Sequence, residues 1–288
     1  MATNTQLLKR RRHAQHVVVD DGFQQQEQQQ HLTLYYLDLP WAARAEPLRI
    51  ALEIAGLDYE YKTLSAQEFL AIQTALPFGQ LPVLEIRHSD YQYTLAQSNT
   101  ILRYIGRLGK GQIYPKDPLL AGRCDEVMDA VQDVYSLLAP SNRERDHAVK
   151  VSMRQALAAN GLPKWLHFLE AKLTANNTGY FVGSGLTVAD LMASQLVTWL
   201  TAGLLEGIPP SIVAAFPRLC GLRALLLQHP AVRAYAQRVA APVPSEAATL
   251  PSLLHQRSAC APAPLPTSPV RCHDSDAADL RDESSDGE

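Results

Sequence analysis

Residues 76–109 read LPFGQLPVLEIRHSDYQYTLAQSNTILRYIGRLG, and this stretch decides the fold. An apolar run (VLEI) follows Pro82, and proline suits the start of a strand because it lacks the N–H that a ladder would use. Tyr91–Leu95 alternates apolar and polar residues as a half-buried strand does. Apolar residues then recur at helical spacing from Ile101 to Gly109, which is a natural C-terminal cap. The stretch predicts two strands followed by a helix.

Two backbone features of this unit favour the binding of a peptide that carries a carboxylate. Gln97 and Ser98 stand where the predicted helix begins, and a helix N-terminus offers free N–H groups and a partial positive charge. A peptide lying beside Leu81 could pair with its free backbone groups as an added strand, with Leu81-Pro82 as a candidate cis bond. The alternative for Ser98 is that it only caps its own helix.

The segments before residue 76 complete a thioredoxin-like order of elements. Leu32–Leu37 is rich in apolar and aromatic residues and predicts a strand. Pro47 to Ala55 carries a helical apolar stripe that ends at Gly56, and Tyr59–Thr63 predicts a second strand. We therefore expect an α/β domain over residues 31–109.

The rest of the ordered chain has helical spacing. Residues 110–117 form a Gly- and Pro-containing linker, and residues 118–241 predict an all-helical C-terminal domain. Within it, LTVAD predicts a helix start with Thr187 as N-cap and Asp190 in a capping box. Loss of Asp190 should cost about 1 kcal/mol of stability or more.

Both ends of the chain lack a core-forming pattern. Residues 1–30 hold a basic run at Lys9–Arg12 and a glutamine-rich segment, and residues 242–288 are rich in proline, serine and acids. We expect a disordered N-terminal arm and a disordered acidic tail. The basic run is compatible with a targeting address, but short runs of this kind are more often solvated tail.

Composition excludes several classes of protein. The net charge is -3, most of it from the acidic tail, and the near-neutral body offers no basic face for nucleic acid. No apolar run reaches the roughly 20 residues that span a membrane. The four cysteines show neither metal-ligand nor C-x-x-C spacing, which favours a reduced, cytoplasmic protein without a metal.

FGQLPVLE followed by LAQSNTILRYIGRLG resembles the glutathione-binding half of the cytosolic glutathione transferases, closest to the pi and sigma classes. The resemblance extends over about residues 32–241. It implies a homodimeric enzyme that conjugates the glutathione thiolate to small electrophiles, with glutathione as co-substrate and no other cofactor. It also leaves open a glutathione-dependent isomerase or peroxidase, and a non-catalytic ligand carrier or crystallin-like structural protein.

The resemblance also implies roles for individual residues. YLDLPWAARAEPLR is similar to the family's first strand and helix start, with about two extra residues near Trp41-Ala42. This register makes Tyr36 the catalytic tyrosine, with Tyr35 as the competing candidate, because consecutive strand residues face opposite sides. The implied glutathione contacts are Arg44, Phe69, Gln73, Gln80, Leu81, Pro82, Gln97, Ser98 and, across the dimer interface, Asp133.

Two of these positions depart from the family pattern. Phe69 stands where tryptophan is usual and Gln73 where lysine is usual, so the contacts to the glycyl end of glutathione lose an indole donor and a charge. We expect weaker glutathione binding as a result. The electrophile pocket is expected between the domains, lined by Leu37, Leu39 and the helix within residues 119–145.

Overall fold

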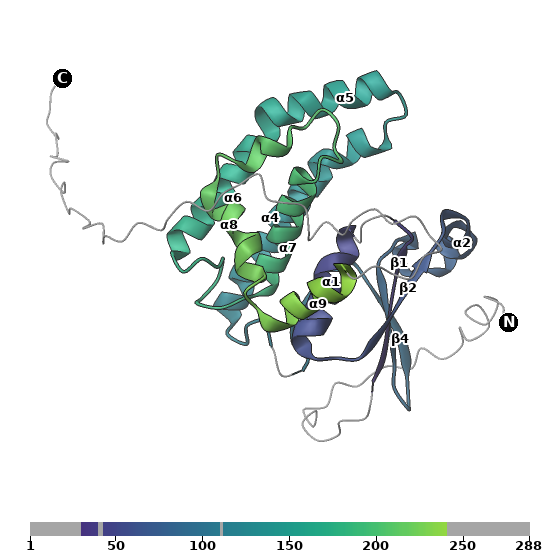
Figure 1. The fold of residues 1–288 in the computed structure, drawn as a ribbon. Coiled ribbons are helices and arrows are strands. Elements are labelled where there is room, and N and C mark those ends of the chain that lie inside the picture. The colour runs from purple at the N-terminus through teal and green to yellow at the C-terminus, as the bar shows by residue number, and fades with distance from the viewer. Residues whose placement is uncertain (1–29, 40–42, 110–111, 241–288) are drawn as a thin grey trace, which may run out of the picture.

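The computed structural model describes residues 30–39, 43–109 and 112–240 (Figure 1). The predictions for the two tails and for the Trp41-Ala42 insertion lie outside these residues. The first described part is built on one four-stranded sheet with the order β2-β1-β3-β4. Its strands are β1 (His31–Leu37), β2 (Tyr59–Leu64), β3 (Val83–Arg87) and β4 (Gln92–Ala96).

Strand β1 lies in the middle of the sheet, parallel to β2 and antiparallel to β3, and β3 is antiparallel to β4. Helices α1 (Glu46–Ala55) and α3 (Ser98–Ile105) pack against each other beside it, and α2 (Ala66–Ile72) lies on the other side of the sheet (Figure 1). The thioredoxin-like order predicted from the sequence is confirmed.

Helix α3 is shorter than its apolar spacing predicts. It ends at Ile105 with Gly106 as its C-cap, so the assignment of Gly109 as the cap is wrong. Gly109 has φ +67°, and a Cβ placed on it would overlap the carbonyl oxygen of Ala55. The glycine is therefore required by the close approach of its backbone to the end of α1.

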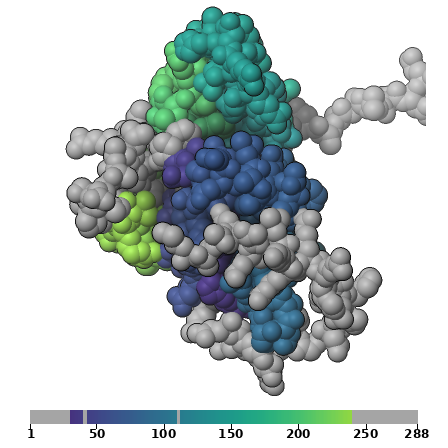
Figure 2. Space-filling model, turned by 90° about the vertical axis from the view of Figure 1, so that its right-hand side faces the viewer, coloured from purple at the N-terminus to yellow at the C-terminus, as the bar shows by residue number. Residues whose placement is uncertain are grey.

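The second described part is helical, as expected, and α7 lies at its centre with almost every side chain buried. Helices α4 and α8 pack against α7, and so does α1 of the sheet domain. Figure 2 shows the teal and green helices seated directly on the blue surface of the sheet domain. The elements are α4 (Pro118–Arg143), α5 (His147–Ala156), a π-helical turn (Leu157–Gly161), α6 (Leu162–Asn176), α7 (Val188–Thr201), α8 (Pro217–Leu226) and α9 (Pro230–Ala240).

The predicted start of α7 is present in full. Asp190 is completely buried, and one carboxylate oxygen accepts hydrogen bonds from the Thr187 main-chain N–H and hydroxyl, both at 2.7 Å. The other oxygen accepts from the Phe181 N–H at 2.8 Å. The carboxylate therefore ties the preceding loop to the first turn of the helix.

Helix α9 returns to the sheet domain and lies beside α1 (Figure 1). The Tyr235 hydroxyl is 3.0 Å from both carboxylate oxygens of Glu46, and Arg238 forms a 2.6 Å ion pair with Glu53. The last described helix therefore joins the two parts of the chain. In the part of the chain that the structure describes, no helix has both the length and the apolar character to cross a bilayer.

Candidate active site

Strand register brings three predicted site residues to one end of the sheet. Tyr35 pairs with Val83 across β1 and β3, so the next residue, Tyr36, faces Pro82 when the register is continued. Val83 pairs with Ala96 across β3 and β4, which places Pro82 opposite Gln97 in the same way. The predicted catalytic tyrosine, the proline turn and the start of α3 therefore form one row.

Tyr36 is 6% exposed and lies on the core side of β1. The main-chain N–H of Arg44 donates a hydrogen bond to its hydroxyl oxygen at 3.4 Å. Burial raises the pKa of Tyr36 above its ordinary value, against the lowering effect of Arg44. The phenol therefore stays protonated at neutral pH and can donate its hydrogen to an anion.

Tyr35 occupies the opposite face of the same strand. Its ring is half-buried, and the Lys62 ammonium lies 5.8 Å from the ring centroid. Tyr35 is absent from the cavity that Tyr36 lines. Of the two candidates for the catalytic tyrosine, Tyr36 therefore faces the cavity and Tyr35 faces away from it.

Arg44 points from the loop before α1 towards α4. One guanidinium nitrogen donates to the Gln132 side-chain oxygen at 2.8 Å, and the guanidinium carbon lies 4.5 Å from the centroid of the Tyr135 ring. Sequence reasoning did not identify Gln132 or Tyr135 as parts of the site. The helical apolar spacing of this segment predicts a packed helix, and it gives no indication of which face of α4 meets Arg44.

The turn before β3 presents unpaired backbone beside the start of α3. The Leu81-Pro82 bond is cis, and no described backbone group hydrogen-bonds to the N–H or C=O of Leu81. Gln97 is exposed and has φ +71°, a backbone conformation uncommon for residues other than glycine. Ser98 is 7% exposed and is the first residue of α3, so it does not occupy the N-cap position.

Phe69 lies in the middle of α2, and Gln73 comes directly after this helix. Phe69 is half-buried, and the Gln73 side-chain amide donates to the carbonyl of Gly79 at 3.2 Å. Gln80, the next residue, is exposed. Gln73 therefore supports the loop that carries Gln80 and Leu81, and its side-chain donor is engaged with the protein backbone.

Asp133 is an exposed residue of α4 and does not join the other predicted residues within this chain. No ion pair or side-chain hydrogen bond joins it to another described residue. Its neighbour Gln132 is the residue that holds Arg44.

A cavity of about 440 Å³ opens beside Tyr36 between the two parts of the chain. It contains Leu39 and one face of α4, as expected, but Leu37 is not among its lining residues because it alternates to the other side of β1. Most of the C-terminal residues in its wall were not predicted. The lining residues are Tyr36, Leu39, Ala43, Arg44, Tyr135, Ala139, Asn142, Arg143, Arg154, Gln195, Trp199, Leu204 and Leu205.

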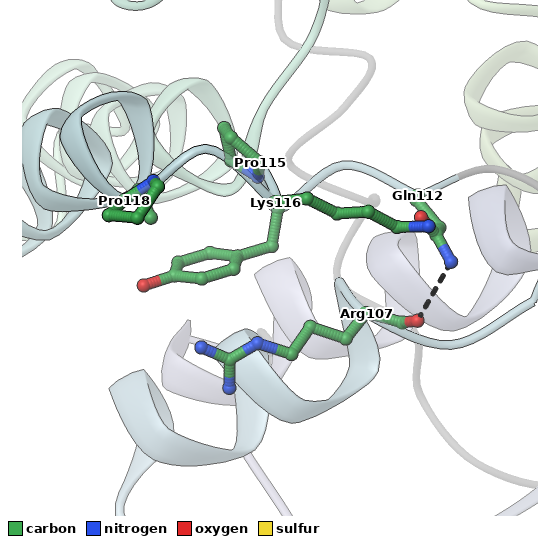
Figure 3. A pocket seen from close by; sticks show the side chains of 7 residues that line it. Arg107, Gln112, Pro115, Lys116 and Pro118 are labelled. Carbon is green, nitrogen blue, oxygen red and sulfur yellow. Dashed lines mark hydrogen bonds between the residues drawn. The ribbon is translucent and has the colours of Figure 1, made fainter. Parts of the chain in front are cut away.

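A second cavity, of about 390 Å³, lies where the sheet domain leads into α4 (Figure 3). The Arg107 guanidinium carbon lies 4.4 Å from the centroid of the Tyr114 ring, and the Gln112 amide donates to the Arg107 carbonyl at 3.3 Å. None of the predicted site residues lines this cavity.

Within the described ranges, neither a metal-binding cluster nor the Cys124 thiol offers competing chemistry. No cluster of three or more histidine, cysteine, aspartate or glutamate side chains is placed there to hold a metal ion. Cys124 is buried on α4, and burial raises the pKa of its thiol to about 11, so it remains protonated at neutral pH.

Comparison with known families and proteins matches both parts of the chain. Residues 32–107 match the family model "Glutathione S-transferase, N-terminal domain", and residues 132–238 match "Glutathione S-transferase, C-terminal domain". Probable glutathione S-transferase 6 of Caenorhabditis elegans is 32% identical over 173 residues, which are 58% of this chain and 79% of that protein.

Two further relatives have other names. S-crystallin SL11 of Nototodarus sloanii is 27% identical over 208 residues, 72% of this chain and 95% of that protein. The structure of rat hPGDS complexed with a quinoline has a TM-score of 0.62 at 27% identity, covering 72% of this chain and 96% of that one.

Proposed function

Because the chain belongs to the glutathione S-transferase family and is a glutathione transferase, we propose that Tyr36 is its catalytic residue. The buried Tyr36 hydroxyl is the observation that carries this proposal, because it lines the cavity at the end of the sheet where a peptide can pair. Glutathione is then the co-substrate, and no metal or other cofactor takes part.

Tyr36 acts by donating a hydrogen bond to the glutathione sulfur. Binding the charged form of a thiol lowers its pKa from about 8.5 towards neutrality. Each unit requires about 1.4 kcal/mol, and one hydrogen bond to a charged group supplies about 1.5 to 3 kcal/mol. The raised pKa of Tyr36 keeps its proton on the oxygen, where it is needed for this donation.

Glutathione binds in an extended form beside Leu81, whose free N–H and C=O pair with the backbone of the cysteinyl unit. Gln97, Ser98 and the N-terminus of α3 bind the γ-glutamyl carboxylate. Phe69 and Gln73 contact the glycyl end, more weakly than an indole and an ammonium would. Gln80 and Pro82 contact glutathione from this turn, and Arg44 contacts it at the rim beside the sulfur.

The electrophile occupies the cavity between the two parts of the chain. The sulfur lone pair forms a bond to its electron-poor carbon, and the leaving group departs with the electron pair of the broken bond. For addition to an activated double bond, the neighbouring carbon instead takes a proton from water. The thiol proton is released to solvent before the attack.

The active form is proposed to be a cytoplasmic homodimer in which Asp133 of one subunit binds the γ-glutamyl ammonium in the site of the other. The exposure of Asp133 and its lack of an ion pair among the described residues support this assignment.

Two measurements on the full chain test the function. We expect the protein to be retained on immobilised glutathione and to accelerate the reaction of glutathione with chlorodinitrobenzene, a small neutral electrophile. Binding without turnover would support a carrier or an S-crystallin-like role instead. Turnover limited to isomerisation or peroxide reduction would support the other glutathione-dependent activities.

A further inference from the structure

The cavity beside Tyr36 carries positive charge and no described negative charge. Arg44, Arg143 and Arg154 line it, and none of its lining residues is an aspartate or a glutamate. Arg154 is the buried one of the three, and a cavity that receives only neutral hydrophobic compounds gains nothing from a buried guanidinium group, because the group is costly to desolvate without a counter-charge.

Arg154 is the most informative of the three. It is 8% exposed and is the one residue of α5 that is buried. Among the described residues its guanidinium donates to uncharged oxygens alone: Asn142 Oδ1 at 2.9 Å, Ser141 Oγ at 3.3 Å and the main-chain carbonyl of Glu206 at 3.5 Å. A buried cation held by neutral acceptors is a ready site for an anion.

No carboxylate among the described residues forms an ion pair with this arginine. The Glu206 side chain lies 2.8 Å from the His147 ring, and it forms no ion pair with Arg154. Burial lowers the pKa of Arg154 from its ordinary value, although the charge of Glu206 raises it. Arg143, on α4, is exposed at the same end of the cavity and has no ion pair within the described ranges.

The cavity follows α4, with one end at Tyr135 and the other at Asn142. Tyr135, Ala139 and Asn142 lie on one helix face, and Tyr135 to Asn142 spans about 10 Å at 1.5 Å per residue. Tyr135 is the residue under Arg44, near Tyr36, whereas Asn142 is the residue bound by Arg154. The end of the cavity at Arg154 therefore lies about 10 Å further along α4 than the end at Tyr135.

The walls between these two ends are largely apolar. Trp199, Leu204 and Leu205 face the cavity from α7 and the loop after it. Gly207, with φ +91°, lets this loop approach α5, because a Cβ there would lie 2.8 Å from the Val151 carbonyl oxygen. The cavity thus offers a polar reactive end, an apolar middle and a cationic far end.

We propose that the electrophile is an elongated carboxylic acid, with its carboxylate on Arg154 and Arg143 and its reactive carbon at Tyr36. This inference rests on the proposed function and adds the class of substrate. Carboxylate is the matching anion because a guanidinium binds it with two parallel hydrogen bonds, and the apolar walls fit a hydrocarbon chain.

A binding experiment tests the anion site without requiring turnover. Saturated monocarboxylic acids of increasing chain length and their methyl esters are titrated into the full-length protein by calorimetry. We expect the best acid to bind at least about tenfold more tightly than its ester, since a hydrogen bond to a charged group supplies that much free energy. Equal affinities, or binding of neither compound, would overturn the proposal.

Three variants test whether Arg143 and Arg154 cause the preference for acid over ester. Arg143→Gln changes an exposed residue and should reduce the preference for acid over ester severalfold, and adding Arg154→Gln should abolish it. Arg145→Gln removes the same charge from an exposed residue that does not line the cavity, and should keep the preference. Melting temperatures identify any variant that fails to fold. A preference that survives in the folded single and double variants refutes the assignment to these arginines.

Turnover measurements distinguish the proposed substrate class, an elongated carboxylic acid, from glutathione transferase activity in general. A chain bearing an enone at one end and a carboxylate at the other is compared with its methyl ester, both with glutathione. We expect the ratio of kcat/KM for acid over ester to follow the binding preference in each variant. Turnover of both compounds at equal kcat/KM would refute the substrate class and leave the transferase intact. No turnover of either, or of chlorodinitrobenzene, would refute the function while the binding result stands.

Discussion

The two adjacent tyrosines of β1 illustrate how one residue of register decides the chemistry. Tyr36 faces the cavity and receives the Arg44 N–H, whereas Tyr35 faces away towards Lys62. Alternation along a strand requires that only one of them reaches the site, but it does not say which. The choice of Tyr36 came from the resemblance, and the direction of the two side chains agrees with it.

Replacement of Tyr36 by phenylalanine should raise the pKa of bound glutathione by about one to two units, because the mutation removes a hydrogen bond worth about 1.5 to 3 kcal/mol. The thiolate is the deprotonated form, so its fraction at neutral pH falls and the acid limb of kcat/KM moves to higher pH. Thiolate absorbance and the pH profile of kcat/KM measure the two effects.

Tyr35→Phe is the matched control for this experiment, since it removes the same hydroxyl from the other face of the strand. It should leave the pH profile of kcat/KM in place. Because burial raises the pKa of Tyr36, no alkaline loss of activity from its ionisation is expected near neutral pH. An unchanged thiol pKa in Tyr36→Phe would remove Tyr36 from the mechanism.

At the scale of elements, features with local causes could be predicted from the sequence and those with tertiary causes could not. The start of α7 follows from Thr187 and Asp190 alone, because a capping box is made within four residues. The need for glycine at position 109 comes from its contact with Ala55, which is far away in sequence. The role of Arg154 likewise depends on how α5 packs on α4, and helical spacing carries no information about that.

Asp190→Ala should destabilise the protein by about 3 kcal/mol or more, because it leaves buried donors of Thr187 and Phe181 without an acceptor. Thr187→Ser keeps the hydroxyl and should cost only about 1 kcal/mol, the value of one buried methyl group. Urea unfolding followed by circular dichroism gives both free energies of unfolding. Equal, small losses in the two variants would show that the carboxylate does not hold the loop.

At the scale of the whole molecule, α9 closes the helical part onto the sheet domain through Tyr235 and Glu46. A chain ending at residue 245 should keep the melting temperature of the full protein, since the remaining sequence has no core-forming pattern. A chain ending at residue 228 lacks α9 and should melt several degrees lower, because Tyr235 and Val232 are buried. Differential scanning calorimetry compares them, and an equal loss in both would show that the segment after residue 245 docks on the body.

The glutathione site of one subunit lacks an anion for the γ-glutamyl ammonium unless Asp133 of the other subunit supplies it. Gln97 and Ser98 provide hydrogen-bond donors for a carboxylate, but the γ-glutamyl ammonium needs an anion, and Asp133 is exposed and unpaired among the described residues. Removing one partner of a desolvated charge pair costs about 2 to 5 kcal/mol, part of it from the ammonium left unpaired. Asp133→Asn should therefore weaken glutathione binding, measured by calorimetry, while the thiol pKa moves little because it is governed by Tyr36.

A heterodimer of two variants tests whether Asp133 acts in the site of the other subunit. In a heterodimer of Tyr36→Phe and Asp133→Asn chains, one site carries both changes and the other site carries neither, provided that Asp133 acts across the interface. About half of the wild-type activity should then return when the two impaired homodimers exchange subunits. Differently tagged chains allow the heterodimer to be purified and its exchange confirmed. If Asp133 served its own subunit, each site would carry one change, and the heterodimer would be no more active than the average of the two homodimers.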